Sequence, residues 1–289
     1  MFGAGAAVQA VKQMRRTPPA ATAGVWHVVA GDDSAVLKLL HLDRVESTWP
    51  AEPDETDPYF WRREALAYTS GLLAESAPLR APVCRGVFER ADGTLALWLE
   101  DVRAAPAWTP ELLGSVAHGL GRMQARHAAD PPAAQWLSRD WLRTYLALHD
   151  APDPEAETVL ARLDMQTQTL CHHDLHPGNV LGANADVVID WAYCGLASLG
   201  LDAGVLVADG IADSAFAPEL ADVVAAEVWS GYLDGLRAGG FAGDESEVRY
   251  AFLRGTALRL SWLPRGMRPA WDATVDLLDR WCDEACELA

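Results

Sequence analysis

Residues 171–181 read CHHDLHPGNVL, and residues 187–191, which read VVIDW, follow after a short turn. These two stretches carry three side chains with oxygen donors, namely Asp174, Asn179 and Asp190. A loop that holds the first two and returns through a hairpin to the third brings all three donors to one point. Phosphoryl transfer needs such a set, because a carboxylate orients the attacking hydroxyl and further oxygen ligands hold magnesium against nucleotide phosphates.

The histidines of the same stretch allow a second hypothesis. Three of the residues around Asp174 are histidines, namely His172, His173 and His176. A metal-dependent phosphohydrolase would use a His-Asp doublet here, with His127 or His149 upstream and Asp190 downstream as further ligands. That class of enzyme is helical around its metal, whereas residues 180–181 and 187–189 are apolar runs around the turn 182–186 and predict strands. The hydrolase is therefore the less favoured hypothesis.

Strand signals dominate the first hundred residues after a short predicted helix. Residues 1–20 are small and Ala-rich and end in Thr-Pro-Pro-Ala, which predicts a helix followed by a break. Residues 25–29 (VWHVV) and 35–40 (AVLKLL) flank the turn cluster 31–34. They predict a hairpin with Lys38 in its second strand.

The next segment alternates between irregular and regular structure. Residues 41–58 are rich in Glu, Asp and Pro and predict an irregular insertion. Residues 59–73 have helical spacing and include Glu64. Residues 83–89 and 94–100 predict two more strands around a turn.

From residue 110 onward the periodicity is mainly helical. The predicted helices cover residues 111–127, 140–148, 201–209, 218–238, 247–262 and 270–288. Residues 103–106 (RAAP) read as a linker. The sequence thus predicts an α+β fold with a small β-rich lobe over residues 1–102 and a larger, mainly helical lobe over residues 103–289.

The central motif resembles that of a known family. The pattern His172-x-Asp174-x-x-x-x-Asn179, followed by Ile189-Asp190-Trp191, is similar to the catalytic loop and metal motif of aminoglycoside phosphotransferases and their choline-kinase-like relatives. The resemblance implies a bilobal, protein-kinase-like fold. It also implies that Asp174 is the catalytic base and that Asn179 and Asp190 bind Mg²⁺.

Further positions extend the resemblance across residues 21–210. Lys38 and Glu64 match the family's phosphate-binding lysine and its helix partner. Residues 97–102 match the hinge whose backbone grips adenine, which assigns Glu100 and Val102 to nucleotide binding. By the same resemblance Asp202 braces the catalytic loop and His172 is structural. The nucleotide-covering loop is expected just before Val25, where Gly24 is the available glycine.

Composition limits the classes of partner. The chain has 23 Lys and Arg against 41 Asp and Glu, a formal charge of -18. This charge repels phosphate backbones and excludes nucleic acid as the expected partner. It favours a cationic substrate, although a solvated acidic surface explains it equally well. The acids that would meet an ammonium group also fit an exposed helix face: Asp209, Asp213, Glu227 and Asp234.

Other features bear on the cellular setting. No run of 18 apolar residues and no basic stretch leading into an apolar one occurs, so we expect no membrane span and no secretion signal. Five scattered cysteines without a C-x-x-C pair fit a reducing cytoplasm. No sequence feature specifies an oligomeric state.

The sequence therefore predicts a cytoplasmic, ATP- and Mg²⁺-dependent phosphotransferase that moves the γ-phosphate to a small-molecule hydroxyl. The acidic charge favours a cationic, aminoglycoside-like antibiotic or metabolite as acceptor. A kinase for a peptide hydroxyl in natural-product biosynthesis is an alternative. A regulated protein kinase fits less well, since the chain has no Ala-Pro-Glu segment and no Arg before Asp174. An inactive nucleotide-binding module would lack one of the matched residues, and none is missing.

Overall fold

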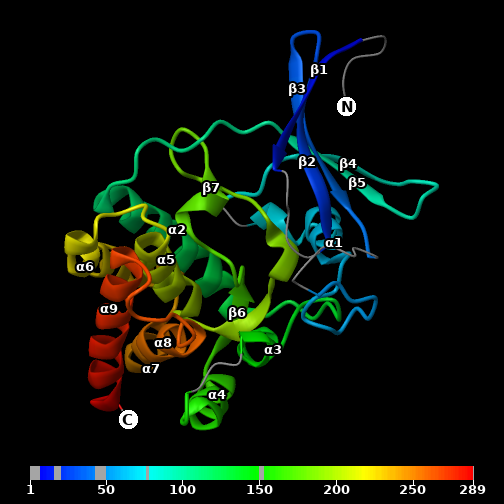
Figure 1. Ribbon diagram of the computed structural model, residues 1–289. Coiled ribbons are helices and arrows are strands. Elements are labelled where there is room, and N and C mark those ends of the chain that lie inside the picture. The colour runs from blue at the N-terminus through cyan, green and yellow to red at the C-terminus, as the bar shows by residue number, and fades with distance from the viewer. Residues whose placement is uncertain (1–6, 16–20, 43–49, 76–77, 150–152, 289) are drawn as a thin grey trace.

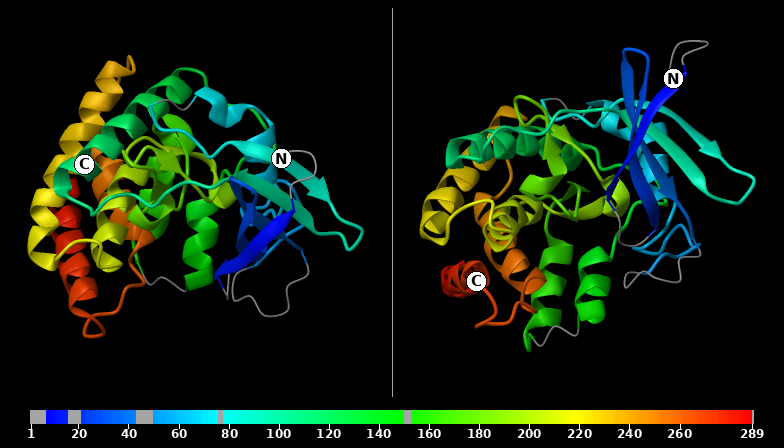
Figure 2. Two further views of the ribbon diagram at one scale, coloured as in Figure 1. Left: turned by 90° about the horizontal axis from the view of Figure 1, so that it is seen from above. Right: turned by 45° about the horizontal axis from the view of Figure 1, so that its top comes forward.

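The fold is α+β, as the sequence predicts, in a computed structural model that describes residues 7–15, 21–42, 50–75, 78–149 and 153–288. A five-stranded sheet with helix α1 (Arg63–Thr69) lies on one side of the molecule. Helices of the second half of the chain lie on the other side (Figures 1 and 2).

The sheet is antiparallel, with strand order β1-β2-β3-β5-β4. Its strands are β1 (Val8–Arg15), β2 (Thr22–Ala30), β3 (Asp33–Leu40), β4 (Cys84–Glu89) and β5 (Leu95–Glu100). Both predicted hairpins, β2–β3 and β4–β5, are confirmed. Lys38 pairs with Val25 on one side and with Leu97 on the other, so it lies on the central strand.

The helix predicted over residues 1–20 is wrong where the structure describes it, because residues 8–15 form the edge strand β1. Residues 1–6 and 16–20, which include the predicted Thr-Pro-Pro break, lie outside the described residues. The apolar side chains of β1 are exposed, Val8 to 58% and Val11 to 59%. The strand therefore lacks the alternation of a half-buried strand, and pairing with β2 overrides its local helix propensity.

The segment between the sheet and α1 is irregular, as expected, in its described part. Residues 43–49 of the predicted insertion lie outside the described residues. Residues 50–58 form turns and end against Arg63, which donates to the carbonyl oxygens of Asp57 (2.6 Å) and Pro58 (2.5 Å). Arg63 also donates to the Trp136 carbonyl at 2.7 Å, which ties α1 to the chain beyond helix α2.

The second half of the chain is mainly helical. Its helices are α2 (Pro110–Ala129), α3 (Trp141–His149), α4 (Ala156–Met165), α5 (Leu201–Ala212), α6 (Ala221–Ala238), α7 (Glu245–Tyr250), α8 (Thr256–Arg259) and α9 (Pro269–Cys286). A π-helical turn, Ala251–Gly255, joins α7 to α8 within the predicted helix 247–262. Helix α4 was not predicted. No helix in the described ranges is long and apolar enough to cross a membrane.

Four glycines allow α2 and α6 to pack with their backbones in contact. A Cβ on Gly235 would lie 2.1 Å from the carbonyl oxygen of His118, and one on Gly231 would lie 2.2 Å from that of Gly114. A Cβ on Gly121 would lie 2.3 Å from the carbonyl oxygen of Tyr232. Only residues without a side chain permit α2 and α6 to lie so close together. This packing places Tyr232 of α6 near the loop of residues 172–179.

Short strands carry the central motif between these helices. They are β6 (Gln168–Cys171), β7 (Val180–Leu181), β8 (Val187–Val188) and β9 (Gly195–Ser198). β6 pairs with β9 and β7 pairs with β8, so the strands predicted around the motif are confirmed. The predicted lobe boundary at residues 102/103 falls between β5 and α2 and stays a prediction.

Candidate active site

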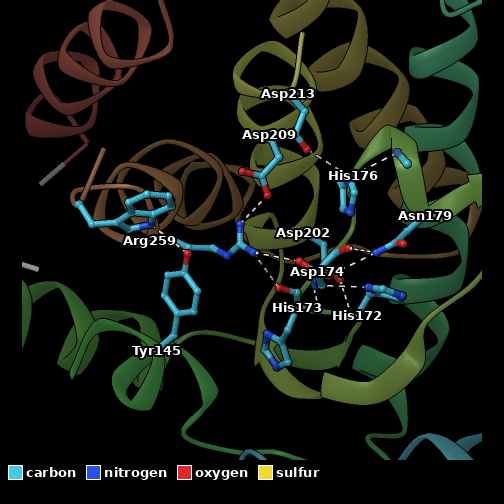
Figure 3. A network of polar contacts seen from close by, with 12 residues as sticks. Tyr145, His172, His173, Asp174, His176, Asn179, Asp202, Asp209, Asp213 and Arg259 are labelled. Carbon is cyan, nitrogen blue, oxygen red and sulfur yellow. Dashed lines mark hydrogen bonds and ion pairs between the residues drawn. The ribbon is translucent and has the colours of Figure 1, made fainter. Parts of the chain in front are cut away.

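Asp174 and Asn179 lie on the loop between β6 and β7 and contact one another (Figure 3). The Asn179 amide nitrogen Nδ2 donates to the Asp174 carbonyl oxygen at 2.9 Å and to its Oδ2 at 3.3 Å. The Asn179 carbonyl oxygen accepts from the Ile189 N–H at 2.9 Å. The loop is thereby fastened to the chain that leads to Asp190.

His172 holds the loop and is not exposed to a ligand. Its Nε2 lies 2.8 Å from the carbonyl oxygen of Ile189, and its Nδ1 accepts from the Asp174 N–H at 3.2 Å. Since a carbonyl only accepts, Nε2 carries the proton and the ring is neutral. Burial lowers the pKa of His172, which agrees with that state. The expected structural role of His172 fits these contacts.

Asp202, at the start of α5, binds the backbone of the same loop. Its two carboxylate oxygens accept from the N–H groups of His172 at 2.7 Å and His173 at 3.0 Å. His173 has φ of 67°, a left-handed conformation that costs a residue with a side chain about 1–2 kcal/mol. The two charge-assisted hydrogen bonds offset that cost. The expected bracing contact of Asp202 is therefore present.

A buried polar network fixes Asp202 in turn. Gln124 of α2 donates to Asp202 Oδ2 and to the Leu170 carbonyl, each at 3.2 Å. Tyr232 of α6 donates to Gln124 Oε1 at 2.5 Å and accepts from the Gly200 N–H at 2.9 Å. The packing of α2 on α6 thus determines where the loop lies.

Lys38, Glu64 and Asp190 form an ionic triad, in which Lys38 and Glu64 are buried and Asp190 is partly exposed. Lys38 Nζ lies 2.6 Å from Glu64 Oε2 and 2.7 Å from Asp190 Oδ1, and the Lys38 and Glu64 side chains are 8% and 2% exposed. Burial alone would lower the pKa of Lys38, but the two carboxylates raise it above its ordinary value. Burial raises the pKa of Glu64, and Lys38 opposes that rise. The structure thus brings together the predicted phosphate-binding lysine, its predicted helix partner Glu64 and one of the two predicted metal ligands.

Asp190 has an unusual backbone, with φ of 64° and ψ of 56°. Trp191 holds this turn, because its indole N–H donates to the Val188 carbonyl at 2.9 Å and its ring packs edge-on against His172. Asp and Asn adopt the left-handed region more readily than most residues. The turn directs the Asp190 carboxylate to Lys38.

The triad borders a cavity of about 380 Å³ between the sheet and the loop. Its walls include the Lys38, Glu64, Asn179 and Asp190 side chains, and Glu100 and Val102 of the predicted hinge also line it. The Glu100 carboxylate is bound to the Arg80 guanidinium at 2.6 and 3.0 Å. Its side chain is therefore engaged, and its backbone N–H donates to the Val83 carbonyl oxygen at 2.9 Å.

The expectation for Gly24 is wrong. Gly24 lies within β2 and pairs with Leu39, so it is not part of a loop before the strand. Residues 16–20, between β1 and β2, lie outside the described residues. Sequence reasoning placed Gly24 before the strand because it began that strand at Val25, whereas β2 begins at Thr22.

A second cavity, of about 210 Å³, is lined in part by Asp174. Its lining is aromatic and charged: Trp141, Tyr145, Asp174, His176, Tyr193, Asp209, Asp213 and Arg259. A smaller hollow of about 90 Å³ adjoins both cavities, since it shares Asn179 and Asp190 with the first and Asp174 and Tyr193 with the second. Asp209 and Asp213 are thus at the site, whereas Glu227 and Asp234 do not line it.

Arg259 is a site residue that sequence reasoning missed. It ends α8, its side chain is 4% exposed, and it lies 2.7 Å from Asp209 Oδ2 and 3.5 Å from Asp174 Oδ1. Figure 3 shows it between these two carboxylates. Its signal in the sequence is a single charge within the apolar run of residues 255–263. A lone arginine in such a run is normally paired when buried.

Comparisons with known proteins identify the family and the fold. The sequence profile of the phosphotransferase enzyme family matches residues 15–241. No curated protein matches the chain. Among solved structures, an amicoumacin kinase in complex with AMP-PNP, Ca²⁺ and Ami has 16% identity and a TM-score of 0.62, with 96% of this chain and 88% of that chain covered.

Two further structures are similar. A choline/ethanolamine kinase family protein from Mesorhizobium loti has 15% identity and a TM-score of 0.54, covering 98% of this chain and 90% of that one. A thermostable mutant of aminoglycoside phosphotransferase APH(4)-Ia with ADP and hygromycin B has 13% identity and a TM-score of 0.54, covering 98% and 95%. These likenesses confirm the kinase-like fold. Since the family profile covers most of its length, the chain belongs to the phosphotransferase enzyme family.

Proposed function

We propose that this protein transfers the γ-phosphate of ATP to a hydroxyl group of a small molecule, with Mg²⁺ as cofactor. One observation carries the proposal: Lys38, Asn179 and Asp190 line one cavity, Asp174 lines the next, and a hollow adjoins both. A nucleotide on one side and an acceptor on the other would therefore meet at Asp174.

Lys38 would bind the nucleotide phosphates. Its ammonium is held by Glu64 and Asp190 on the central strand of the sheet, so it is placed before a nucleotide binds. A flexible ammonium suits mobile phosphate oxygens. Residues 97–102, including Glu100 and Val102, would contact adenine through the backbone.

The donors at the metal position suit magnesium. Asp190 offers a carboxylate, and Asn179 offers Oδ1, because its Nδ2 is turned to Asp174. Mg²⁺ prefers oxygen ligands and commonly binds through one or two side chains together with substrate phosphates. When bound, it would neutralise charge on the phosphate oxygens.

Asp174 would accept or orient the proton of the attacking hydroxyl. Its Oδ2 faces Asn179 and its Oδ1 faces Arg259, so the carboxylate has a defined orientation. Burial raises the pKa of Asp174, and Arg259 opposes the rise. Phosphoryl transfer has a loose transition state in most analyses, so positioning supplies much of the catalysis.

A small, amine-bearing acceptor fits the second cavity. Asp209 and Asp213 lie there beside the rings of Trp141, Tyr145 and Tyr193. Structural relatives bear names of kinases for amicoumacin, choline or ethanolamine, and aminoglycosides, which supports a small-molecule acceptor. The cytoplasm, where ATP is available, is the proposed location.

The hydrolase hypothesis fits the geometry less well. Both ring nitrogens of His172 hold the loop, and the His173 ring is buried against Trp141 at 5.1 Å. Neither imidazole is turned to a shared metal with Asp174. We therefore favour the kinase.

Transfer from γ-labelled ATP to a panel of amino alcohols, aminoglycosides and peptides, with and without Mg²⁺, tests the proposal. Asp190→Asn is a suitable variant, because Asn tolerates the left-handed backbone while the negative charge is lost. We expect phosphate transfer to a small molecule. The transfer should require Mg²⁺, and its rate should fall about a hundredfold or more in the variant. Absence of nucleotide binding to the wild type would refute the proposal. Transfer to peptides alone would show that the acceptor is a peptide hydroxyl and not a small molecule.

A further inference from the structure

Arg259 contacts the loop and α5 at the same time. Its Nη1 donates to Asp209 Oδ2 at 2.7 Å, and its Nη2 donates to the carbonyl oxygen of His173 at 3.2 Å. Nη2 also lies at ion-pair distance, 3.5 Å, from Asp174 Oδ1 (Figure 3). One guanidinium thus joins α5 to the residue before Asp174 and to Asp174 itself.

Aromatic rings fix the position of this guanidinium. Its central carbon lies 5.2 Å from the ring centres of both Trp141 and Tyr145. Its Nε is buried and has no hydrogen-bond partner in the described part of the chain. A planar guanidinium held between aromatic rings presents its N–H donors in one fixed geometry, which a lysine ammonium does not reproduce.

Each carboxylate oxygen of Asp174 therefore contacts a different side chain. Asn179 Nδ2 approaches Oδ2 at 3.3 Å, and Arg259 approaches Oδ1 at 3.5 Å. The hydrogen bond from Arg259 to the His173 carbonyl also fixes the backbone that carries Asp174. Removing Arg259 would release one side of the carboxylate.

Arg259 also determines which acid faces an acceptor. The Asp209 side chain is 17% exposed and is neutralised by Arg259. The Asp213 side chain is 63% exposed and lies 3.5 Å from His176 Nδ1. That nitrogen also accepts from the Gly178 N–H at 3.3 Å, and a nitrogen that accepts there cannot donate to Asp213. Asp213 is therefore available to a cation, and Asp209 is not.

We propose that Arg259 is a positioning residue of the acceptor side, which orients Asp174 and neutralises Asp209 so that Asp213 is the carboxylate that binds an acceptor ammonium group. This inference rests on the proposed phosphotransferase function. It implies a cavity that takes one ammonium group in preference to two, because Asp209, one of the two acids that line it beside Asp174, is already paired with Arg259.

Arg254 supplies a matched control. It is also a nearly buried arginine, 10% exposed, and lies five residues earlier on the same helical segment. It pairs with Asp153 at 2.9 Å and Glu155 at 3.2 Å, and it does not line the acceptor cavity. Arg254→Met therefore removes a buried ion pair without changing the site.

The variants to compare are Arg259→Met, Arg259→Lys, Arg259→Met with Asp209→Asn, Asp213→Asn and Arg254→Met. The double variant removes both charges of the buried Arg259–Asp209 pair, so it leaves no unpaired charge at position 209 and is the version expected to fold if Arg259→Met alone does not. Asp174 positioning is measured as kcat for ATP hydrolysis without acceptor, where water replaces the hydroxyl. Cavity charge is measured by ligand-observed NMR binding of 3-amino-1-propanol, with one ammonium, and 1,3-diamino-2-propanol, with two.

We expect kcat to fall about tenfold or more in all three Arg259 variants and to stay within about twofold of wild type in Arg254→Met. The preference for the dication should rise about tenfold in Arg259→Met, where Asp209 is unmasked, and should remain at the wild-type value in Arg259→Lys and in the double variant. Asp213→Asn should weaken binding of both probes.

Wild-type kcat in the Arg259 variants would overturn the positioning role. An unchanged probe preference in Arg259→Met, unaltered probe binding in Asp213→Asn, or no binding of either probe to the wild type would overturn the charge assignment. Absence of Mg-ATP binding and of hydrolysis in the wild type would instead refute the proposed function, which separates the two failures.

Discussion

His173 should make the protein lose stability in mild acid. The residue is 2% exposed, and its ring stacks on Trp141 with centroids 5.1 Å apart. Neither ring nitrogen has a hydrogen-bond partner among the described residues. Burial, with smaller contributions from Arg259 and His172, lowers the pKa of His173 from 6.5 to about 3.

The direction of the effect follows from proton uptake. Between these two pKa values the folded protein keeps His173 neutral, whereas the unfolded chain binds a proton there. Because the unfolded state binds more protons, stability falls as pH decreases from the unfolded pKa toward the folded one. From pH 7 to pH 5 the loss due to this one group is about 2 kcal/mol.

The variant His173→Asn isolates this contribution. Asn tolerates the left-handed backbone at φ of 67° and does not titrate. Urea unfolding of both proteins at the two pH values gives the free energy of unfolding, and the wild type should lose about 2 kcal/mol more than the variant. Equal losses in both proteins would refute the account of a buried neutral His173.

Three further changes test the support of the site. Gly235→Ala should lower the free energy of unfolding by about 1–3 kcal/mol in urea, because a Cβ there would lie 2.1 Å from the His118 carbonyl oxygen; an unchanged midpoint would show that α2 and α6 separate freely. Asp202→Ala should lower it by about 3 kcal/mol or more in the same assay, since two buried N–H groups lose their acceptor, and a smaller loss would contradict the bracing role. Lys38→Met should cost about 3–5 kcal/mol at neutral pH by leaving the buried Glu64 carboxylate unpaired, and adding Glu64→Gln should recover part of that loss; no recovery would argue against the triad.

The local parts of the fold were predictable because their signals lie in short stretches of sequence. The β2–β3 hairpin and the convergence of the oxygen donors from Asp174 to Asp190 were predicted from turn residues and spacing. In the structure the two strands pair, and the donors line one hollow. Lys38 and Glu64 were predicted by resemblance, and they form an ion pair at 2.6 Å.

The missed features depend on tertiary contacts. β1 is an exposed edge strand whose residues favour a helix until β2 pairs with them. Gly24 was assigned to a loop, although it lies in β2, because the predicted strand began at Val25. Arg259 lies 85 residues from Asp174 in the chain, so only the packing of α8 against the loop that carries Asp174 reveals their contact.

The central claim is that Asp174 acts on the acceptor hydroxyl while Lys38, Asn179 and Asp190 hold the nucleotide and its metal. Single-turnover transfer by Asp174→Asn, measured beside Mg-ATP affinity, tests it most directly. The account predicts transfer about a thousandfold slower than wild type, with Mg-ATP affinity within a few fold of it. Transfer within about tenfold of the wild-type rate would contradict the account.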